Sequence, residues 1–196
     1  MSIAQDIQAL AQRTVKAARI LSAASPAAKN EALLALAGLL RARGADIATE
    51  NGKDLAQAEK NGLDGPRMDR LKLTDAVIED MAQACEHVAG LDDPVGAIET
   101  MWQRPNGLQV GRMRIPLGVV AMIYESRPNV TVDSGILCLK AGNGVILRGG
   151  SEAIHSNLFL ASLVHEALES AGLPKDAIQV IPTTDRAAAT ELLKLE

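Results

Sequence analysis

The chain has 196 residues, of which 47% are hydrophobic and 22% are charged, and its formal net charge is −4. This composition is too apolar for a disordered chain, and the negative charge argues against the basic footprint of a nucleic-acid-binding protein. No apolar run reaches the roughly 18 to 20 residues that a membrane span requires, so we expect no membrane partner.

The first hundred residues are predicted to be mainly helical. Apolar residues recur at helical spacing from Ile3 to Leu21. Ser25 and Pro26 combine a helix N-cap with a proline at the first helical position, and the apolar stripe that follows ends near Gly44, which we interpret as a C-terminal glycine. A third helix is expected over residues 45–60, and Thr74 is expected to cap a fourth.

The second part of the chain is predicted to form a sheet. Apolar and polar residues alternate from Leu108 to Pro116, which indicates a half-exposed strand. Strands and helices then alternate over residues 119–124, 132–140, 145–148, 156–171, 178–181 and 186–195. This order is typical of an α/β fold with a parallel sheet. We therefore predict an N-terminal helical part (1–105) and a Rossmann-like parallel sheet (106–196). This sheet would be incomplete, because only three of its strands are predicted and such sheets normally have about five or six.

Ligands bind open parallel sheets beyond the carboxyl ends of the strands, which selects residues 125–131, 149–155 and 182–185. Residues 107–150 contain five basic and two acidic side chains, and this local positive balance favours an anionic ligand. Arg127 and Arg148 follow strand ends and are interpreted as functional, whereas Arg112 and Arg114 are equally explained as the solvent face of a strand. Four polar residues also crowd around Pro128, more than a turn needs.

Arg148 opens a glycine-containing segment that leads from a predicted strand into a helix. Gly149 and Gly150 would let a ligand approach the backbone, and the free N–H groups of the helix start would suit a phosphate or a ribose hydroxyl. Gly-Gly turns are common, so this segment alone identifies no cofactor. No GxGxxG or GxxxxGK[ST] string occurs, which argues against an ordinary dinucleotide fingerprint or a P-loop.

The cysteines and histidines indicate neither a disulfide framework nor a metal site. Cys85 and Cys138 are far apart and have no CxxC partner, so we expect two reduced thiols in a cytoplasmic protein, with Cys85 in the core. The three histidines share no metal-ligand spacing. His165 is interpreted as structural, and His155 is the one that could touch a ligand.

Several strings resemble the gamma-glutamyl phosphate reductase family of the aldehyde dehydrogenase superfamily. The most specific is Tyr-Glu-Ser-Arg-Pro-Asn within residues 114–135, followed by Leu-Arg-Gly-Gly-Ser-Glu within residues 138–153. Residues 50–55, 92–96 and 171–174 are also similar to the family, so the resemblance covers essentially the whole chain. It implies an atypical Rossmann domain of the aldehyde dehydrogenase type, which lacks the usual glycine fingerprint.

The resemblance implies reduction of L-glutamyl 5-phosphate to L-glutamate 5-semialdehyde by NADPH, with release of phosphate, in proline biosynthesis. In that family a cysteine thiolate forms a thioester, which accepts a hydride from the nicotinamide. A homo-oligomer and coupling to glutamate 5-kinase are also implied. The implied cofactor-binding residues are Arg148, Gly149, Gly150, Ser151 and Glu152, and the implied substrate-binding residues are Ser126, Arg127 and Asn129. Either Arg127 or Asn129 would be the oxyanion donor.

The chain departs from the family in length. Family members are roughly twice as long and carry the nucleophilic cysteine in the second half, and neither Cys85 nor Cys138 stands in a matching position. We therefore expect the catalytic domain to be absent from this chain, which would supply the N-terminal helices and the first half of the cofactor domain. A non-catalytic nucleotide-binding fragment or module is the alternative.

Overall fold

A three-stranded parallel sheet organises the chain in a computed structural model, which describes residues 2–195. Its strands are β3 (Val119–Ile123), β4 (Gly144–Arg148) and β5 (Ile178–Val180), hydrogen-bonded in the order β3-β4-β5. Because all three strands run in the same direction, their carboxyl ends meet at one edge of the sheet. The predicted α/β fold is confirmed.

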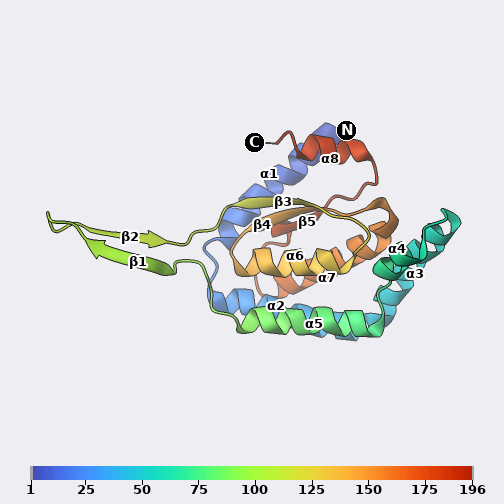
Figure 1. The fold of residues 1–196 in the computed structure, drawn as a ribbon, viewed down its shortest axis with the longest axis horizontal. Helices are drawn as coiled ribbons and strands as arrows, with labels where there is room; N and C mark the ends of the chain where they lie inside the picture. The colour runs from blue at the N-terminus through green and yellow to red at the C-terminus, as the bar shows by residue number, and fades with distance from the viewer. Residues whose placement is uncertain (1, 196) are drawn as a thin grey trace.

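Helices cover both faces of this sheet (Figure 1). Helices α1 (Ile3–Leu21) and α8 (Arg186–Leu192) pack together on one face. Helices α6 (Asn129–Lys140) and α7 (Ile154–Ser170) lie on the other face. Each helix buries an apolar stripe against the strands, which stabilises the layers by removing that surface from water.

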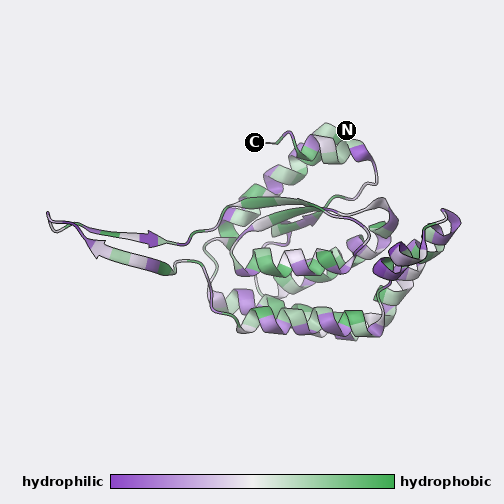
Figure 2. Ribbon diagram, viewed as in Figure 1, coloured by the Kyte–Doolittle hydropathy of each residue, from purple (hydrophilic) through white to green (hydrophobic). Residues whose placement is uncertain are grey.

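Strand β4 lies at the centre of the sheet and contributes to two separate apolar clusters. Val145 and Leu147 are fully buried in the cluster that includes α6 and α7, while Ile146 between them belongs to the cluster with α1 and α8. Successive side chains of a strand point to opposite faces, so this uninterrupted apolar run fills both layers. Figure 2 shows hydrophobic residues along the strands of the sheet.

The remaining N-terminal helices form an outer layer and a side wall. Helices α2 (Pro26–Ala42) and α5 (Asp75–Gly90) pack against each other, and α2 contacts α7 while α5 contacts α6. Helix α3 (Gly44–Lys60) packs on α7, and the short α4 (Gly65–Leu71) packs on α3. Short 3₁₀ turns precede α7 at Ser151–Ala153 and β5 at Lys175–Ala177.

A β-hairpin extends away from these layers (Figure 1). Its strands β1 (Ile98–Gln103) and β2 (Gln109–Met113) are antiparallel, and every residue in them except Val110 is exposed. The sequence predicted one half-exposed strand here and missed β1. Because both faces of β1 are exposed, its sequence does not need the alternation of apolar and polar residues that marks a half-buried strand.

Three details differ from the sequence predictions. Gly44 does not end a helix in a left-handed conformation but begins α3, and the C-cap of α2 is Arg43. Helix α4 was not predicted, because its seven residues give too short a periodic pattern. The boundary proposed after residue 105 falls between β1 and β2, and this division into parts stays a prediction. The Ser25, Pro26 and Thr74 helix starts are confirmed.

Candidate functional site

A cleft of about 420 Å³ opens beside the C-terminal ends of β3 and β4, and we call it the β4 cleft. Its walls come from the loops after β3, β4 and β5, together with α4. Its charged lining residues are Arg67, Glu125, Arg148, Glu152 and Arg186. Four residues predicted to bind the cofactor, Arg148, Gly150, Ser151 and Glu152, line it together. The strand-end rule therefore located a real cleft.

Arg148 ends β4 and is held by backbone carbonyl groups. Its Nη1 donates to the oxygen of Gly149 (2.7 Å), and its Nη2 donates to the oxygen of Thr184 beyond β5 (3.1 Å). Its Nε is buried and has no hydrogen-bond partner among the described residues. A buried donor without a partner is costly, so this atom is a position where a bound acceptor would be stabilised.

Glu152 is tied to the loop after β3. The backbone N–H of Ser126 donates to Glu152 Oε1 (2.8 Å), and the Ser126 hydroxyl donates to the same oxygen (2.5 Å). Partial burial alone would raise the pKa of Glu152, but these hydrogen bonds, together with those from the Glu152 backbone and the Ser151 side chain, outweigh it and hold the pKa below its usual value. Ser126 adopts φ = 33°, a strained value for a residue that is not glycine. The carboxylate thus clamps the two loops together.

Gly149 and Gly150 are required by the packing of protein side chains. A Cβ on Gly149 would lie 2.1 Å from Asn157 Nδ2, and one on Gly150 would lie 2.2 Å from Glu152 Oε1. The sequence interpretation gave both glycines the role of admitting a ligand. Neighbouring side chains fill the space that a Cβ would take at each position, which gives both glycines a reason in packing, whereas the approach of a ligand and contact with a cofactor stay predictions.

A series of buried hydrogen bonds lies beneath the β4 cleft and links the elements that form it. The Tyr124 hydroxyl lies 2.6 Å from Thr131 Oγ1, which donates to Asn157 Oδ1 at 3.0 Å. Burial raises the pKa of Tyr124 to about 12, so its hydroxyl remains protonated. These hydrogen bonds connect the end of β3 with α6 and α7, and they fix the side chain of Asn157, which packs on Gly149.

Helix α3 supplies a second buried polar support, which the sequence analysis did not identify. Asp54 is 2% exposed and accepts hydrogen bonds from the backbone N–H groups of His155 and Ser156 (3.1 and 2.8 Å) and from the Ser156 hydroxyl (2.6 Å). Asn51, one turn earlier, donates to Ser156 Oγ (3.0 Å). Both residues occur in the family-like segment 50–55, and they hold the start of α7 behind the loop that carries Glu152.

A second cleft, of about 430 Å³, lies on the other side of the loop after β3, and we call it the α6 cleft. Its lining side chains are Asp69, Arg70, Lys72, Val77, Asp80, Met81, Arg127, Asn129 and Asp133. Asn129 begins α6, and its Nδ2 donates to Asp133 Oδ2 (3.0 Å). Burial raises the pKa of Asp133, and this hydrogen bond offsets only part of the effect.

The structure therefore divides the three residues predicted to bind substrate. Ser126 lines the β4 cleft, whereas Arg127 and Asn129 line the α6 cleft. The division between the two clefts falls between Ser126 and Arg127, and Pro128, the buried N-cap residue of α6, lies between the two residues of the α6 cleft. The loop thus has one polar wall facing each cleft.

Arg67 and Arg186 also line the β4 cleft, and the sequence analysis did not select them. Arg186 stands one residue beyond the third loop chosen by the strand-end rule, so a slightly wider window would have included it. Arg67 comes from α4, and no local pattern connects an exposed helical arginine to a distant strand end.

Several other basic residues selected by charge lie away from both clefts. Lys140 is buried, and its Nζ donates to Asn30 Oδ1 (2.8 Å) and to the Ala89 carbonyl (3.0 Å). Arg112 lies in β2, and Arg114, just after β2, forms an ion pair with Glu99 of β1 (2.8 Å). Both are exposed, as expected for the solvent face of a strand.

Neither cysteine has the surroundings of a nucleophile. Cys85 is fully buried, and burial raises the pKa of its thiol to about 12. Cys138 is half-buried in α6, and burial raises its pKa as well. A reactive cysteine needs an accessible thiolate, so both thiols are structural.

The histidines and acidic residues give no metal centre within residues 2–195, where no cluster of three or more His, Cys, Asp or Glu side chains could hold an ion. His165 Nε2 lies 2.6 Å from the carbonyl oxygen of Ile178, which confirms a structural role. His155 is exposed at the start of α7 and does not line either cleft. Among the described helices, none combines the length and the apolar character needed to cross a membrane.

Comparisons with known proteins agree with this architecture. The model of the aldehyde dehydrogenase family matches residues 2–196. The gamma-glutamyl phosphate reductase of Oleidesulfovibrio alaskensis is 65% identical over 196 residues, which is all of this chain and 47% of that protein. The chain therefore spans about half the length of the curated relatives it matches.

Solved structures give the same result. The crystal structure of gamma-glutamyl phosphate reductase from Thermotoga maritima aligns with a TM-score of 0.93 and 40% identity, over 96% of this chain and 46% of that chain. The corresponding structure from Saccharomyces cerevisiae aligns with a TM-score of 0.88 and 32% identity, over 98% and 48%. The resemblance inferred from the sequence is confirmed, and the chain belongs to the aldehyde dehydrogenase family.

Proposed function

We propose that this chain supplies the nucleotide-binding part of an NADPH-dependent gamma-glutamyl phosphate reductase. The observation that supports this most directly is the β4 cleft, which collects arginine and glutamate side chains at the C-terminal ends of parallel strands. The names of the relatives favour the same reaction, the reduction of L-glutamyl 5-phosphate to L-glutamate 5-semialdehyde with release of phosphate.

The residues of the β4 cleft fit the adenosine end of such a cofactor. Arg148 presents a buried Nε without a partner, which is suited to an acceptor on the ribose or its phosphate. The Glu152 carboxylate, fixed by Ser126, is suited to accept a ribose hydroxyl. Gly149, Gly150 and Ser151 would complete the loop around the ribose. When bound, the nicotinamide supplies the hydride.

We place the acyl phosphate near the loop that opens α6. Arg127 is exposed in the α6 cleft and makes no ion pair among the described residues, so its guanidinium is available to bind an anionic group in two-point fashion. The Asn129 amide lies in the same cleft. Either one would donate to the carbonyl oxygen of the substrate, with Ser126 on the cofactor side of the same loop.

The thioester step requires a thiolate that neither Cys85 nor Cys138 provides, because burial raises the pKa of both. We therefore propose that the nucleophilic cysteine belongs to a part of the protein outside this chain, in keeping with its relatives' greater length. A cytoplasmic homo-oligomer that is coupled to glutamate 5-kinase completes the proposal.

Titration of the chain with NADPH, followed by the fluorescence of the nicotinamide, tests the nucleotide site. Replacing Arg148 by alanine should raise the Kd by roughly tenfold, since it removes charge-assisted hydrogen bonds. The matched change Arg112→Ala, on the exposed hairpin, should leave the Kd unaltered. Thermal melts should first establish that both variants fold. Equal affinity of all three proteins would remove Arg148 from the site, and no binding by the wild type would refute the nucleotide function.

A further inference from the structure

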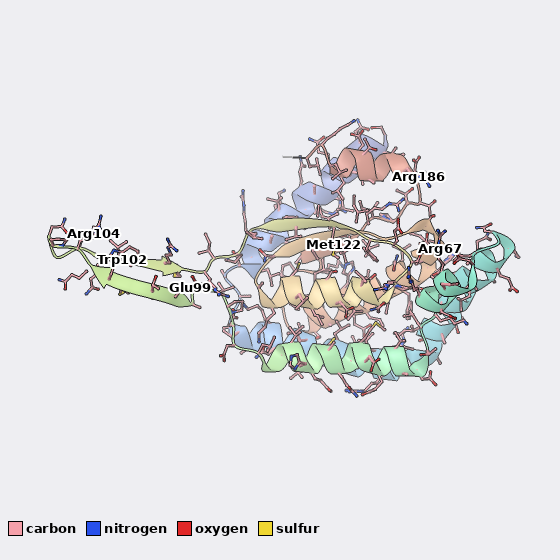
Figure 3. The ribbon with its side chains drawn as sticks, viewed as in Figure 1. Arg67, Glu99, Trp102, Arg104, Met122 and Arg186 are labelled. Carbon is pink, nitrogen blue, oxygen red and sulfur yellow. The ribbon has the colours of Figure 1, made fainter. Side chains whose placement is uncertain are left out.

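Three arginines from distant parts of the chain line the β4 cleft. Arg148 ends β4, Arg67 comes from α4, and Arg186 begins α8. Figure 3 shows Arg67 and Arg186 at the same end of the molecule, where the loops after the strands gather. Of these three arginines, only Arg148 takes part in the proposed contacts to a ribose, so the other two positive charges have no role in those contacts.

Arg67 and Arg186 form no strong ion pair with other described residues. Arg67 Nε lies 3.8 Å from Asp64 in an exposed pair, and such a pair contributes little binding energy. Arg186 makes no side-chain hydrogen bond or ion pair within residues 2–195. Both side chains are exposed, so they can move toward a ligand without losing buried contacts.

The acidic residues of the cleft do not cancel these charges. Glu125 and Glu152 also line it, so the lining carries three positive and two negative charges. Glu152 is engaged by Ser126, whose two hydrogen bonds stabilise its negative charge. The cleft remains positive overall, and a phosphate monoester carries about −1.5 to −2 charges near neutral pH.

We propose that Arg67 and Arg186 bind the phosphate on the 2′ oxygen of an adenosine ribose and thereby determine specificity for NADP(H) over NAD(H). This inference rests on the proposed nucleotide function and names two residues outside the predicted binding segment. Arginine suits this role because its planar guanidinium pairs with phosphate through two parallel hydrogen bonds. Helix α4 of the N-terminal helical part then contributes directly to the cofactor site.

Two ligands that differ only in the relevant group isolate the contact. Isothermal titration of the chain should compare adenosine 2′,5′-bisphosphate with adenosine 5′-monophosphate, for the wild type and for Arg67→Gln, Arg186→Gln and the double variant. Each single change should weaken binding of the bisphosphate by roughly tenfold, which is the effect of one charge-assisted contact, and leave the monophosphate within about twofold.

Arg104→Gln provides the matched control, because it removes the same charge from the exposed hairpin turn, distant from the cleft in Figure 3. The inference predicts that it behaves as the wild type at equal ionic strength. Variants that bind both ligands as the wild type does, or that lose both equally, would overturn the inference and leave the nucleotide function standing. A wild type that binds neither ligand would overturn both.

Discussion

The two clefts flank the same loop but are built in different ways. The β4 cleft is fastened by contacts between segments far apart in the sequence, such as Ser126 with Glu152 and Asp54 with Ser156. The α6 cleft has local contacts, such as Lys72 with Asp69 and Asn129 with Asp133. A ligand at the β4 cleft would meet a preformed surface, whereas the exposed charged residues of the α6 cleft can be substituted with little loss of stability.

This comparison predicts the largest difference for two aspartates. Asp54→Ala should lower the free energy of unfolding by about 3 kcal/mol, because it leaves two buried donors and one part-buried donor at the start of α7 without an acceptor. Asp80→Ala in the α6 cleft should change it by less than about 0.5 kcal/mol, since Asp80 is exposed. Urea denaturation measures both, and similar losses would show that the two clefts are not supported differently.

Glycine substitutions probe the packing around the β4 cleft more finely. Gly149→Ala should cost about 2 kcal/mol, because the new methyl group meets the buried amide of Asn157. Gly150→Ala should cost about 1 kcal/mol, because the new methyl group would displace the Glu152 carboxylate from its hydrogen bonds with Ser126. Gly135→Ala in α6 is the control: its methyl group would lie 3.6 Å from Ile178, so thermal melts should find it neutral or stabilising. A Gly149→Ala protein as stable as the wild type would contradict this packing.

The smallest predicted effects are pH dependences of opposite sign in the two clefts. The folded-state pKa of Glu152 is lowered, so its contribution is present above the unfolded pKa and is lost as the pH falls through the folded value. The folded-state pKa of Asp133 is raised, so its carboxyl favours the fold at low pH and opposes it as the pH rises.

Glu152→Gln should therefore reduce the acid-side loss of stability, whereas Asp133→Asn should increase stability near neutral pH. Each effect should stay below about 1 kcal/mol because both carboxyls are partly exposed to solvent. Urea midpoints between pH 3 and pH 7 measure these slopes. If the two substitutions changed the pH slope of stability in the same direction relative to the wild type, the assigned environments would be contradicted.

The sequence predicted the sheet because its strands carry a local signal. Residues 145–147 form an apolar run that is buried on both faces, and such runs are typical of central parallel strands. The hairpin was only half predicted, since the residues of β1 are exposed and their pattern marks no core. Helix α4 was missed because it is too short to show periodicity.

The β4 cleft was predicted in part for a similar reason. Arg148 could be selected because it ends an apolar strand, and the strand-end rule requires no knowledge of tertiary contacts. Asp54 could not, because a polar residue in a helix is normally exposed, and its burial depends on where α7 begins. Arg67 reaches the cleft from α4, a segment far from β4 in the chain, which only the folded structure reveals.

Hydrogen–deuterium exchange with and without NADPH tests the assignment of the nucleotide to the β4 cleft most directly. Saturating NADPH should slow amide exchange in peptides covering residues 148–156 and 183–188, and should leave residues 72–81 of the α6 cleft unchanged. Unchanged exchange at residues 148–156, or protection confined to residues 72–81, would contradict this assignment.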